Sequence, residues 1–312
     1  MTLIGASITG ATAALQSGDL EIRGTRDVTI NRAIVTNSSG ACISADNSQN
    51  VIIENSLMSN CVQEGYHFSR VNGLTFTSNR VTGNNAAGTV DPGWEAGGGK
   101  VGDSTNILFS DNEADHNVGP GMWFDIGCSN VVVRNNRVHD NASAGIMFEV
   151  STGARIYSND AWSNGTGEAV WGWGAGILIS SSGGADVYSN VLAWNARSGV
   201  SVISQKRTDS APVTNNYVHD NVTAALPNTW LMFWAQDWAG PMFLPASNNR
   251  GADDRFWAPG PENGTPRFTW NGQDDVHLAA FDSTPGGQND TYMSTVDLTA
   301  ILASNGIPTT AP

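Results

Sequence analysis

Residues 131–149 read VVVRNNRVHDNASAGIMFE, and they contain one complete unit of a pattern that recurs along the chain. A short apolar run leads to Asn136, and an apolar residue follows two places later. A second asparagine, Asn141, then precedes a glycine that opens another alternating run. Period-two alternation separated by turn residues predicts short β-strands, three in each unit of about 24 residues.

Paired asparagines, five residues apart, mark the successive units. The first column reads Asn31, Asn55, Asn79, Asn112, Asn136, Asn159, Asn190 and Asn216. The second reads Asn60, Asn84, Asn117, Asn141, Asn164, Asn195 and Asn221, with Thr36 in the first slot. Repeats of roughly 20 to 50 residues are typical of solenoids, propellers and arrays.

Three short strands in each unit decide between these architectures. A propeller blade needs four strands, and neither a leucine-rich spacing nor an amphipathic helix occurs here. The pattern therefore predicts an all-β fold, a right-handed parallel β-helix of about eight coils from Gly18 to Asn221. We expect the asparagines to be buried and hydrogen-bonded from coil to coil. Four apolar residues should stack inside, namely Leu57, Val81, Val138 and Leu192.

The coil pattern and the asparagine columns resemble the pectin-lyase-like superfamily of β-helix proteins over about residues 18–221. The resemblance implies carbohydrate chemistry, because members are mostly polysaccharide lyases, glycoside hydrolases, sugar epimerases and phage tailspikes. Trp123-Phe124-Asp125 is similar to the Trp-x-Asp stretch of pectate lyases, but Ile126 replaces the histidine that follows it there. The lyase motif Arg-x-Pro-x-x-Arg and the three polygalacturonase motifs are absent, so neither activity is carried over.

Composition limits the partners. The net charge of −14 opposes binding to nucleic acid and to other polyanions. No apolar stretch is long enough to cross a bilayer, which predicts no membrane span. Residues 1–5 lack the features of a signal peptide, so we expect that an upstream segment was removed or that the chain is part of a longer protein. We expect a secreted, monomeric or loosely oligomeric protein with a carbohydrate substrate. Cys42, Cys61 and Cys128 allow at most one pair and are expected to be buried as small apolar residues.

The chain changes character after Asn221. Tryptophans crowd between residues 230 and 238, and a stretch rich in Gly, Pro and Asn runs to Gly264. A short helix is predicted at residues 296–303, before Gly306 and Pro308. We therefore expect a β-helix domain over residues 1–221 and a capping segment over residues 222–312 that covers the open end.

Two intervals between asparagines of the first column are longer than the others, from Asn79 to Asn112 and from Asn159 to Asn190. The extra residues, 86–95 and 165–173, fall in the same bend, so both loops should project from one edge of the solenoid. A cleft is predicted between them. Tryptophans should line it, because flat aromatic rings suit the apolar faces of sugars: Trp94, Trp123, Trp171 and Trp173.

Asp125 and Glu149 are expected on the floor of this cleft. They occupy equivalent positions in successive units and should face outward, because Phe124 and Phe148 face inward. One coil would separate the carboxylates by roughly 5 Å. Their repulsion should raise one pKa, giving the acid and the base or nucleophile that glycosidic cleavage needs. An exposed pair or a calcium site is the alternative.

Glu95 and Lys100 are further candidate catalytic residues. The glycines at positions 97–99 are expected to leave open space above the sheet. Lys100 aligns with either Trp123 or Phe124, and the outward alignment is favoured because a buried lysine would lack an evident partner. His67, one coil earlier, could share the cleft as a substrate-binding residue.

Three classes of function remain open. The first is a glycoside hydrolase using Asp125 and Glu149, which requires no cofactor. The second is a polysaccharide lyase or uronate epimerase with Lys100 as base and carboxylates holding Ca²⁺. The third is a non-catalytic carbohydrate-binding or tailspike-like module. One lysine among at least three carboxylates favours a neutral sugar.

Overall fold

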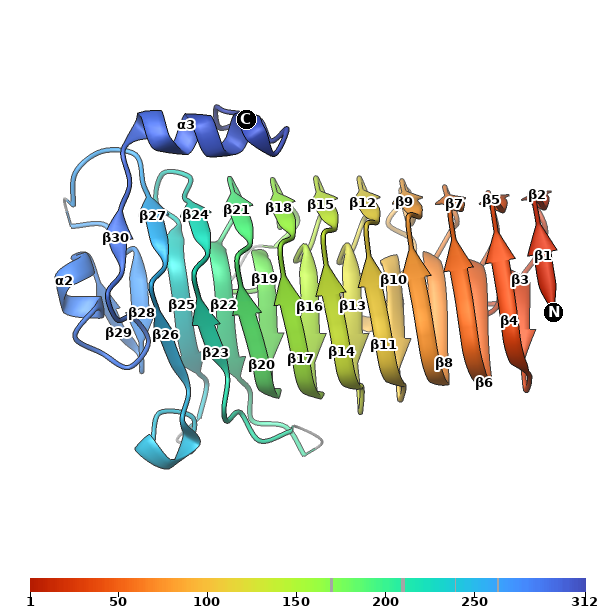
Figure 1. Ribbon diagram of the computed structural model, residues 1–312, viewed down its shortest axis with the longest axis horizontal. Helices are drawn as coiled ribbons and strands as arrows, with labels where there is room; N and C mark the ends of the chain where they lie inside the picture. The colour runs from red at the N-terminus through yellow and green to blue at the C-terminus, as the bar shows by residue number, and fades with distance from the viewer. Residues whose placement is uncertain (169–170, 209–210, 239, 263) are drawn as a thin grey trace.

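The computed structural model describes the 312 residues except 169–170, 209–210, 239 and 263, and it confirms the all-β parallel solenoid (Figure 1). Coils follow one another along the long axis, with the N-terminus at one end. Strands of successive coils pair in parallel and form three ladders. The antiparallel pairing of β28 (Phe268–Trp270) with β29 (Gln273–Asp275) closes the first ladder.

The first ladder carries the cleft strands, and the second follows it around the coil. The first contains β3 (Gly18–Arg23), β10 (Gly97–Gly102), β13 (Met122–Asp125), β16 (Ile146–Glu149), β19 (Ala175–Ser180), β22 (Ser198–Ser204), β25 (Trp230–Gln236) and β28. The second contains β1 (Thr2–Ile4), β4 (Arg26–Asn31), β11 (Thr105–Ser110), β14 (Ser129–Arg134), β17 (Thr152–Tyr157), β20 (Gly183–Tyr188), β23 (Tyr217–His219) and β26 (Arg250–Ala252). Two long strands, β6 (Ala41–Glu54) and β8 (Glu64–Thr77), run through both.

The third ladder is a separate sheet of very short strands. It contains β2 (Ser7–Thr9), β5 (Ile34–Thr36), β7 (Leu57–Ser59), β9 (Arg80–Thr82), β12 (Glu113–Asp115), β15 (Arg137–His139), β18 (Asp160–Trp162), β21 (Val191–Ala193), β24 (Val222–Ala224), β27 (Arg255–Trp257) and β30 (Thr291–Tyr292). Val81, Val138 and Leu192 are fully buried in it, as predicted. Leu57 is not, because Met58 pairs with Val81 and takes the inward position.

The asparagine columns are real, but their ends differ from the prediction. Side chains donate from one coil to the next, as from Asn112 Nδ2 to Asn136 Oδ1 at 2.9 Å. In the early coils the slots belong to Ser56 and Cys61, one residue after the predicted Asn55 and Asn60. Bonds of the same kind show that Asn31 and Thr36 do not belong to the columns, because Ala33 and Ser38 occupy the equivalent positions in that coil.

The later end of the first column also differs from the prediction. Asn190 donates to Asn221, not to Asn216. Asn216 belongs to another row and accepts from the backbone N–H of Ala185. The interval from Asn190 to Asn221 is therefore 31 residues, which is a third insertion.

The ladders continue past the domain boundary expected at residue 221. Asn221 donates onward to Asp254, whose backbone N–H donates to Asp290. The predicted short helix is present as α3 (Thr295–Ser304). It lies along the outside of the solenoid rather than over its end, with Leu298 and Leu302 packed in a small apolar cluster with Trp162 and Trp194 (Figure 1). The other helices in the described part of the chain are α1 (Pro92–Glu95), α2 (Leu278–Phe281) and the 3₁₀ turn η1 (Pro245–Ser247).

Two of the three cysteines form a disulfide, Cys42–Cys61, so the expectation that all three serve only as small apolar residues is wrong. Cys61 occupies an asparagine slot and Cys42 lies at the start of β6, so the bond joins neighbouring coils. Cys128 is buried as a thiol, and burial raises its pKa to about 12. Among the described residues, no helix has the length and apolar character needed to span a membrane.

Candidate functional site

Both predicted insertions lie in the same bend, directly before the cleft strands β10 and β19. The first contains α1, whose N-terminus is capped by the side chain of Asp91 accepting from the Gly93 N–H. In the second, Glu168 accepts from the Ser143 hydroxyl at 2.6 Å and its carbonyl accepts from Arg197. Two residues of this predicted loop, Ala169 and Val170, lie outside the described residues.

A cavity of about 510 Å³ lies between the two insertions, as the sequence predicts. Its floor comes from β10, β13 and β16, and its sides come from the inserted loops. The lining residues include Pro92, Trp94, Lys100, Trp123, Asp125, Met147, Glu149, Glu168, Trp173 and Arg207.

Asp125 and Glu149 face this cavity in the predicted register. Phe124 pairs with Phe148 in the adjacent strand and both are fully buried in the core, so the residues that follow them face outward. Outward does not mean exposed, because the insertions cover this part of the sheet. Asp125 is only 3% exposed and Glu149 only 4%, so both carboxylates are largely removed from water.

The ammonium group of Lys100 forms an ion pair with the carboxylate of Asp125. The pairing of Lys100 with Trp123 confirms the outward register, and its Nζ lies 2.7 Å from Asp125 Oδ2 and 3.3 Å from Glu95 Oε1. Burial raises the pKa of Asp125 above its ordinary value, and Lys100 counteracts only part of that rise. Burial lowers the pKa of Lys100, but Asp125 and Glu95 raise it by more, so the amine stays protonated at neutral pH. Lys100 Nζ also lies 4.2 Å from the ring centroid of Trp123.

Glu149 is a titratable group of the cleft whose pKa lies near neutrality. Burial and the neighbouring Asp125 raise its pKa to about 7, although Arg207 counteracts the rise. Arg207 Nη1 lies 2.5 Å from Glu149 Oε1, and the Ser180 hydroxyl donates to the same oxygen at 3.3 Å. A carboxyl group with this pKa can donate and accept a proton at physiological pH.

Three of the four predicted tryptophans line the cavity. Trp94 stands on α1 and is 47% exposed, whereas Trp123 is almost fully buried in the floor. Trp173 lines the opposite side and packs on an outer apolar cluster around Met147 and Leu178. Trp171 is not among the described lining residues, because its ring packs edge-on against Phe233 at 5.9 Å between centroids.

His67 and Glu95 lie beside the cavity rather than on its surface. His67 pairs with Lys100 in the first ladder, but it lines a neighbouring hollow, as does Glu95. Its Nδ1 lies 2.9 Å from Oε1 of the fully buried Glu64. Burial lowers the pKa of His67 and Glu64 raises it by more, so its net shift is upward.

The glycines before Lys100 leave no open space, contrary to expectation. A Cβ on Gly98 would lie 2.0 Å from the carbonyl oxygen of Gly121, and a Cβ on Gly99 would lie 2.5 Å from the ring of Tyr66. These glycines are required because adjacent backbones approach closely, not because a sugar lies there.

Arg207 is a site residue that the sequence prediction missed. It lies on the insertion between β22 and β23, at the opposite end of the cleft strand from the other two insertions. The signal was present, because the true interval from Asn190 to Asn221 is 31 residues. The long interval was not recognised because Asn216 lies five residues before Asn221, so that these two residues have the spacing of a regular asparagine pair.

A group of side chains able to bind a metal lies away from the cleft. Ligand atoms of Glu113, Asp115 and His139, on β12 and β15, lie within 4.8 Å of one another. Arg80 already donates to Asp115 from Nε at 3.1 Å and from Nη2 at 3.2 Å, so these carboxylates have a protein cation beside them. Calcium at the cleft stays a prediction.

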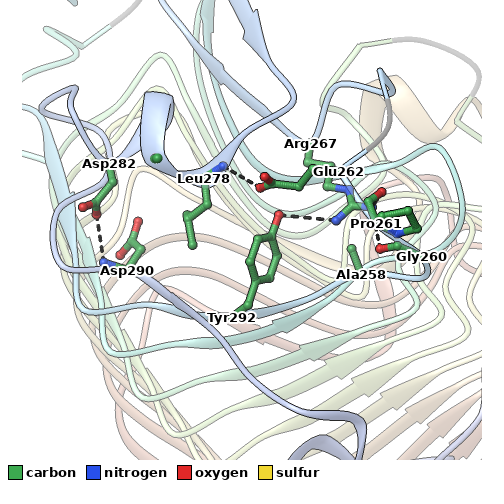
Figure 2. Close-up of a pocket in the computed structure, with 10 residues that line it drawn as sticks. Ala258, Gly260, Pro261, Glu262, Arg267, Leu278, Asp282, Asp290 and Tyr292 are labelled. Carbon is green, nitrogen blue, oxygen red and sulfur yellow. Dashed lines mark hydrogen bonds between the residues drawn. The ribbon is translucent and has the colours of Figure 1, made fainter.

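A larger cavity, of about 680 Å³, lies at the C-terminal end and contains none of the predicted site residues (Figure 2). Arg267 lies in it but donates to the carbonyls of Pro259, Gly260 and Pro261. Glu262 accepts from the Leu278 N–H at 2.7 Å, and Asp282 accepts from the Asp290 N–H at 2.9 Å. Its polar groups therefore mainly hold the C-terminal loops in place.

The chain is similar in structure to several solved proteins, at low identity. A double mutant of the periplasmic alginate epimerase AlgG is 12% identical with a TM-score of 0.49, over 94% of this chain and 73% of that one. The A-module of the Azotobacter vinelandii mannuronan C-5 epimerase AlgE6 is 15% identical with a TM-score of 0.44, over 94% and 79%. The tailspike of Acinetobacter baumannii phage AM24 is 12% identical with a TM-score of 0.35, over 86% and 47%.

Sequence comparison identifies the family. No curated protein matches the chain significantly. Residues 19–179 match the family model described as "Right handed beta helix region". Since that match spans more than half of the chain and lies within the coils described above, the protein belongs to the right-handed β-helix family.

Proposed function

We propose that this protein is a glycoside hydrolase that cleaves a neutral oligosaccharide or polysaccharide in the cleft between the two insertions. Glu149 serves as the general acid, and Asp125 serves as the second carboxylate, nucleophile or base. The observation that carries the proposal is that two carboxylates on adjacent strands have different electrostatic environments. Burial and Asp125 raise the pKa of Glu149 to about 7, whereas Asp125 forms an ion pair with Lys100. Two carboxyl groups with separated pKa values are what glycosidic cleavage requires.

The spacing and the lining support the same reaction. Neighbouring strands lie about 4.8 Å apart, which is nearer to the carboxylate separation of retaining than of inverting enzymes. Trp94 offers a flat apolar face at the cleft entrance. The disulfide Cys42–Cys61 suits an oxidising compartment, which agrees with the proposed secretion.

A polysaccharide lyase or uronate epimerase is the second candidate. It is favoured by the two cations at the cleft, Lys100 and Arg207, which could neutralise a uronate carboxylate. Lys100 is a poor base in this setting because its pKa is raised, so Glu149 would have to abstract the proton.

One screen separates the two reactions. Purified protein is incubated with neutral and uronic polysaccharides, and both new reducing ends and the absorbance of unsaturated products are measured. We expect reducing ends from a neutral substrate without unsaturated product. Asp125→Asn and Glu149→Gln should each lower turnover by about 10²–10⁴-fold, because each removes a proton-transfer or nucleophilic group at nearly constant shape.

The matched control for these variants is Glu113→Gln, which changes a carboxylate outside the cleft and should leave turnover unchanged. Unsaturated product from a uronic polymer, or inversion at C5 without cleavage, would replace the hydrolase with the second candidate.

A further inference from the structure

The floor of the cleft ends abruptly on its N-terminal side. In the first ladder Lys100 pairs with His67, and His67 pairs with Ser44, so a groove along the solenoid would pass over these residues. Of the described residues that line the cleft cavity, none precedes Pro92. His67 and Ser44 line a separate hollow of about 390 Å³. A partition therefore stands between neighbouring coils.

The partition consists of α1 and the side chain of Glu95. Pro92 and Trp94 line the cleft cavity, whereas Glu95 lines the hollow behind it. The Glu95 carboxylate lies 3.3 Å from Lys100 Nζ through one oxygen, and its other oxygen accepts a hydrogen bond from the Gln16 side chain. Glu95 thus joins the cleft strand β10 to the first coil of the solenoid.

The partition is fixed by a buried glutamine. Gln63 is fully buried, and its Nε2 donates to the Glu95 carbonyl at 2.8 Å. Its Oε1 accepts from the Gln16 backbone N–H, and its carbonyl accepts from the Gly97 N–H at 3.1 Å. Buried polar groups that are all hydrogen-bonded hold one arrangement rigidly. We therefore regard the partition as a fixed wall of the cleft.

The opposite side is bounded by two described residues of the second insertion, Glu168 and Trp173. Glu168 is held by Ser143 and Arg197. Among the described lining residues, those of the floor between the walls lie on three strands, β10, β13 and β16. Their two spacings amount to roughly 10 Å, about the length of a disaccharide.

We infer that the cleft receives the end of a sugar chain and binds about two sugar units, while the rest of the chain extends out of the cavity into solvent. This inference rests on the proposed function, because it describes the substrate of the same site. It makes the protein an exo-acting enzyme that releases small products from a chain end.

Binding measurements test the length of the site without requiring turnover. Glu149→Gln protein is titrated calorimetrically with cello-, xylo- and manno-oligosaccharides, from disaccharide to hexasaccharide. In the series that binds, we expect Kd to change less than about twofold beyond the disaccharide. A gain of about tenfold or more from disaccharide to hexasaccharide, about 1.4 kcal/mol, would reveal a long groove and overturn the inference.

Product analysis gives the second arm. On the polysaccharide that the wild type hydrolyses, disaccharide-sized product should appear from the first turnovers while the mean chain length stays nearly constant. The double variant Gln16→Ala/Gln63→Ala removes side-chain hydrogen bonds that hold Glu95 in the wall, so it should shift products towards internal cleavage. The control Gln49→Ala changes an exposed glutamine and should leave the products unchanged.

The two proposals fail differently. A rapid fall in mean chain length with the wild type would overturn the inference and leave hydrolysis standing. Length-independent binding without any hydrolysis would support the short site and refute the proposed reaction alone.

Discussion

At the scale of single residues, the chemistry of the cleft depends on which cation lies beside which carboxylate. Lys100 contacts Asp125 and Arg207 contacts Glu149, although Asp125 and Glu149 are stacked on adjacent strands. If Glu149 must be protonated and Asp125 ionised, activity should follow a bell-shaped pH profile. The basic limb should lie near the Glu149 pKa of about 7.

Substitution of each cation should move a different limb of that profile. Arg207 lowers the pKa of Glu149, so Arg207→Gln should raise that pKa and shift the basic limb to higher pH. Lys100 lowers the pKa of Asp125, so Lys100→Met should raise that pKa and shift the acidic limb to higher pH. Rate–pH profiles of kcat/KM check both shifts. Movement of the same limb by both variants would contradict the assigned roles.

Trp94 and Trp171 form a matched pair for testing the aromatic contacts. Trp94 is exposed at the cleft, so Trp94→Ala should weaken oligosaccharide binding by about 1 kcal/mol, roughly fivefold, without changing the Tm. Trp171 packs on Phe233, so Trp171→Ala should lower the Tm and leave Kd nearly unchanged. Calorimetry and thermal unfolding measure both. The reverse pattern would place the binding surface elsewhere.

At the scale of strands and ladders, the sequence predicted well wherever burial alternates regularly. The register of Phe124 over Phe148, and hence of Asp125 beside Glu149, follows from period two and a regular coil. The assignment of the columns failed in the early coils, where a residue other than asparagine occupies the position, and at Asn216, which lies outside the column. Ser56 occupies the column position that was assigned to Asn55. This one-residue error in register led to the prediction that Leu57 is buried, whereas Met58 takes the inward position. The burial of the carboxylates was also missed, because no local pattern shows that distant loops will cover them.

The asparagine column ends in two aspartates, Asp254 and Asp290. Each accepts from the preceding coil through Oδ1, as an asparagine does. The other oxygen replaces the amide nitrogen, and it has no hydrogen-bond partner among the described residues. Burial, with the charge of Asp290 second, raises the pKa of Asp254 well above its usual value, and burial raises that of Asp290 to about 7.

These aspartates should make the C-terminal coils sensitive to pH. When folding raises the pKa of a carboxyl group, the group does not lower the free energy of unfolding below its unfolded pKa of 3.8, where it is protonated in both states. The free energy of unfolding then decreases as the pH rises through the folded pKa. Asp254→Asn restores the amide donor, so it should raise the free energy of unfolding by about 1–3 kcal/mol at pH 8 and by less at pH 4. Urea unfolding at both pH values measures this. An equal effect at both would show that Asp254 is not protonated in the fold.

At the scale of the whole molecule, stability is spread along one axis, because each coil contacts mainly its neighbours. The two ends are reinforced differently. The C-terminal coils carry α3 along their outer side, whereas the N-terminal coils carry the disulfide Cys42–Cys61 (Figure 1). The cleft lies between these ends, on strands held from both sides, which keeps its stacked carboxylates in register.

Reduction of the disulfide should therefore loosen one end of the solenoid and not the other. Closing the loop between residues 19 apart restricts the unfolded chain, which is worth about 3 kcal/mol in the loop-entropy model. With dithiothreitol, amide hydrogen exchange should accelerate in β6 and β8 while β19 and β22 stay protected. The double variant Cys42→Ser/Cys61→Ser should exchange like the reduced wild type and no longer respond to dithiothreitol. Cys128→Ser is the matched control, because that buried thiol has no disulfide partner and its variant should keep the wild-type response. Acceleration spread evenly over all coils would mean that the solenoid unfolds as one cooperative unit, contrary to this prediction.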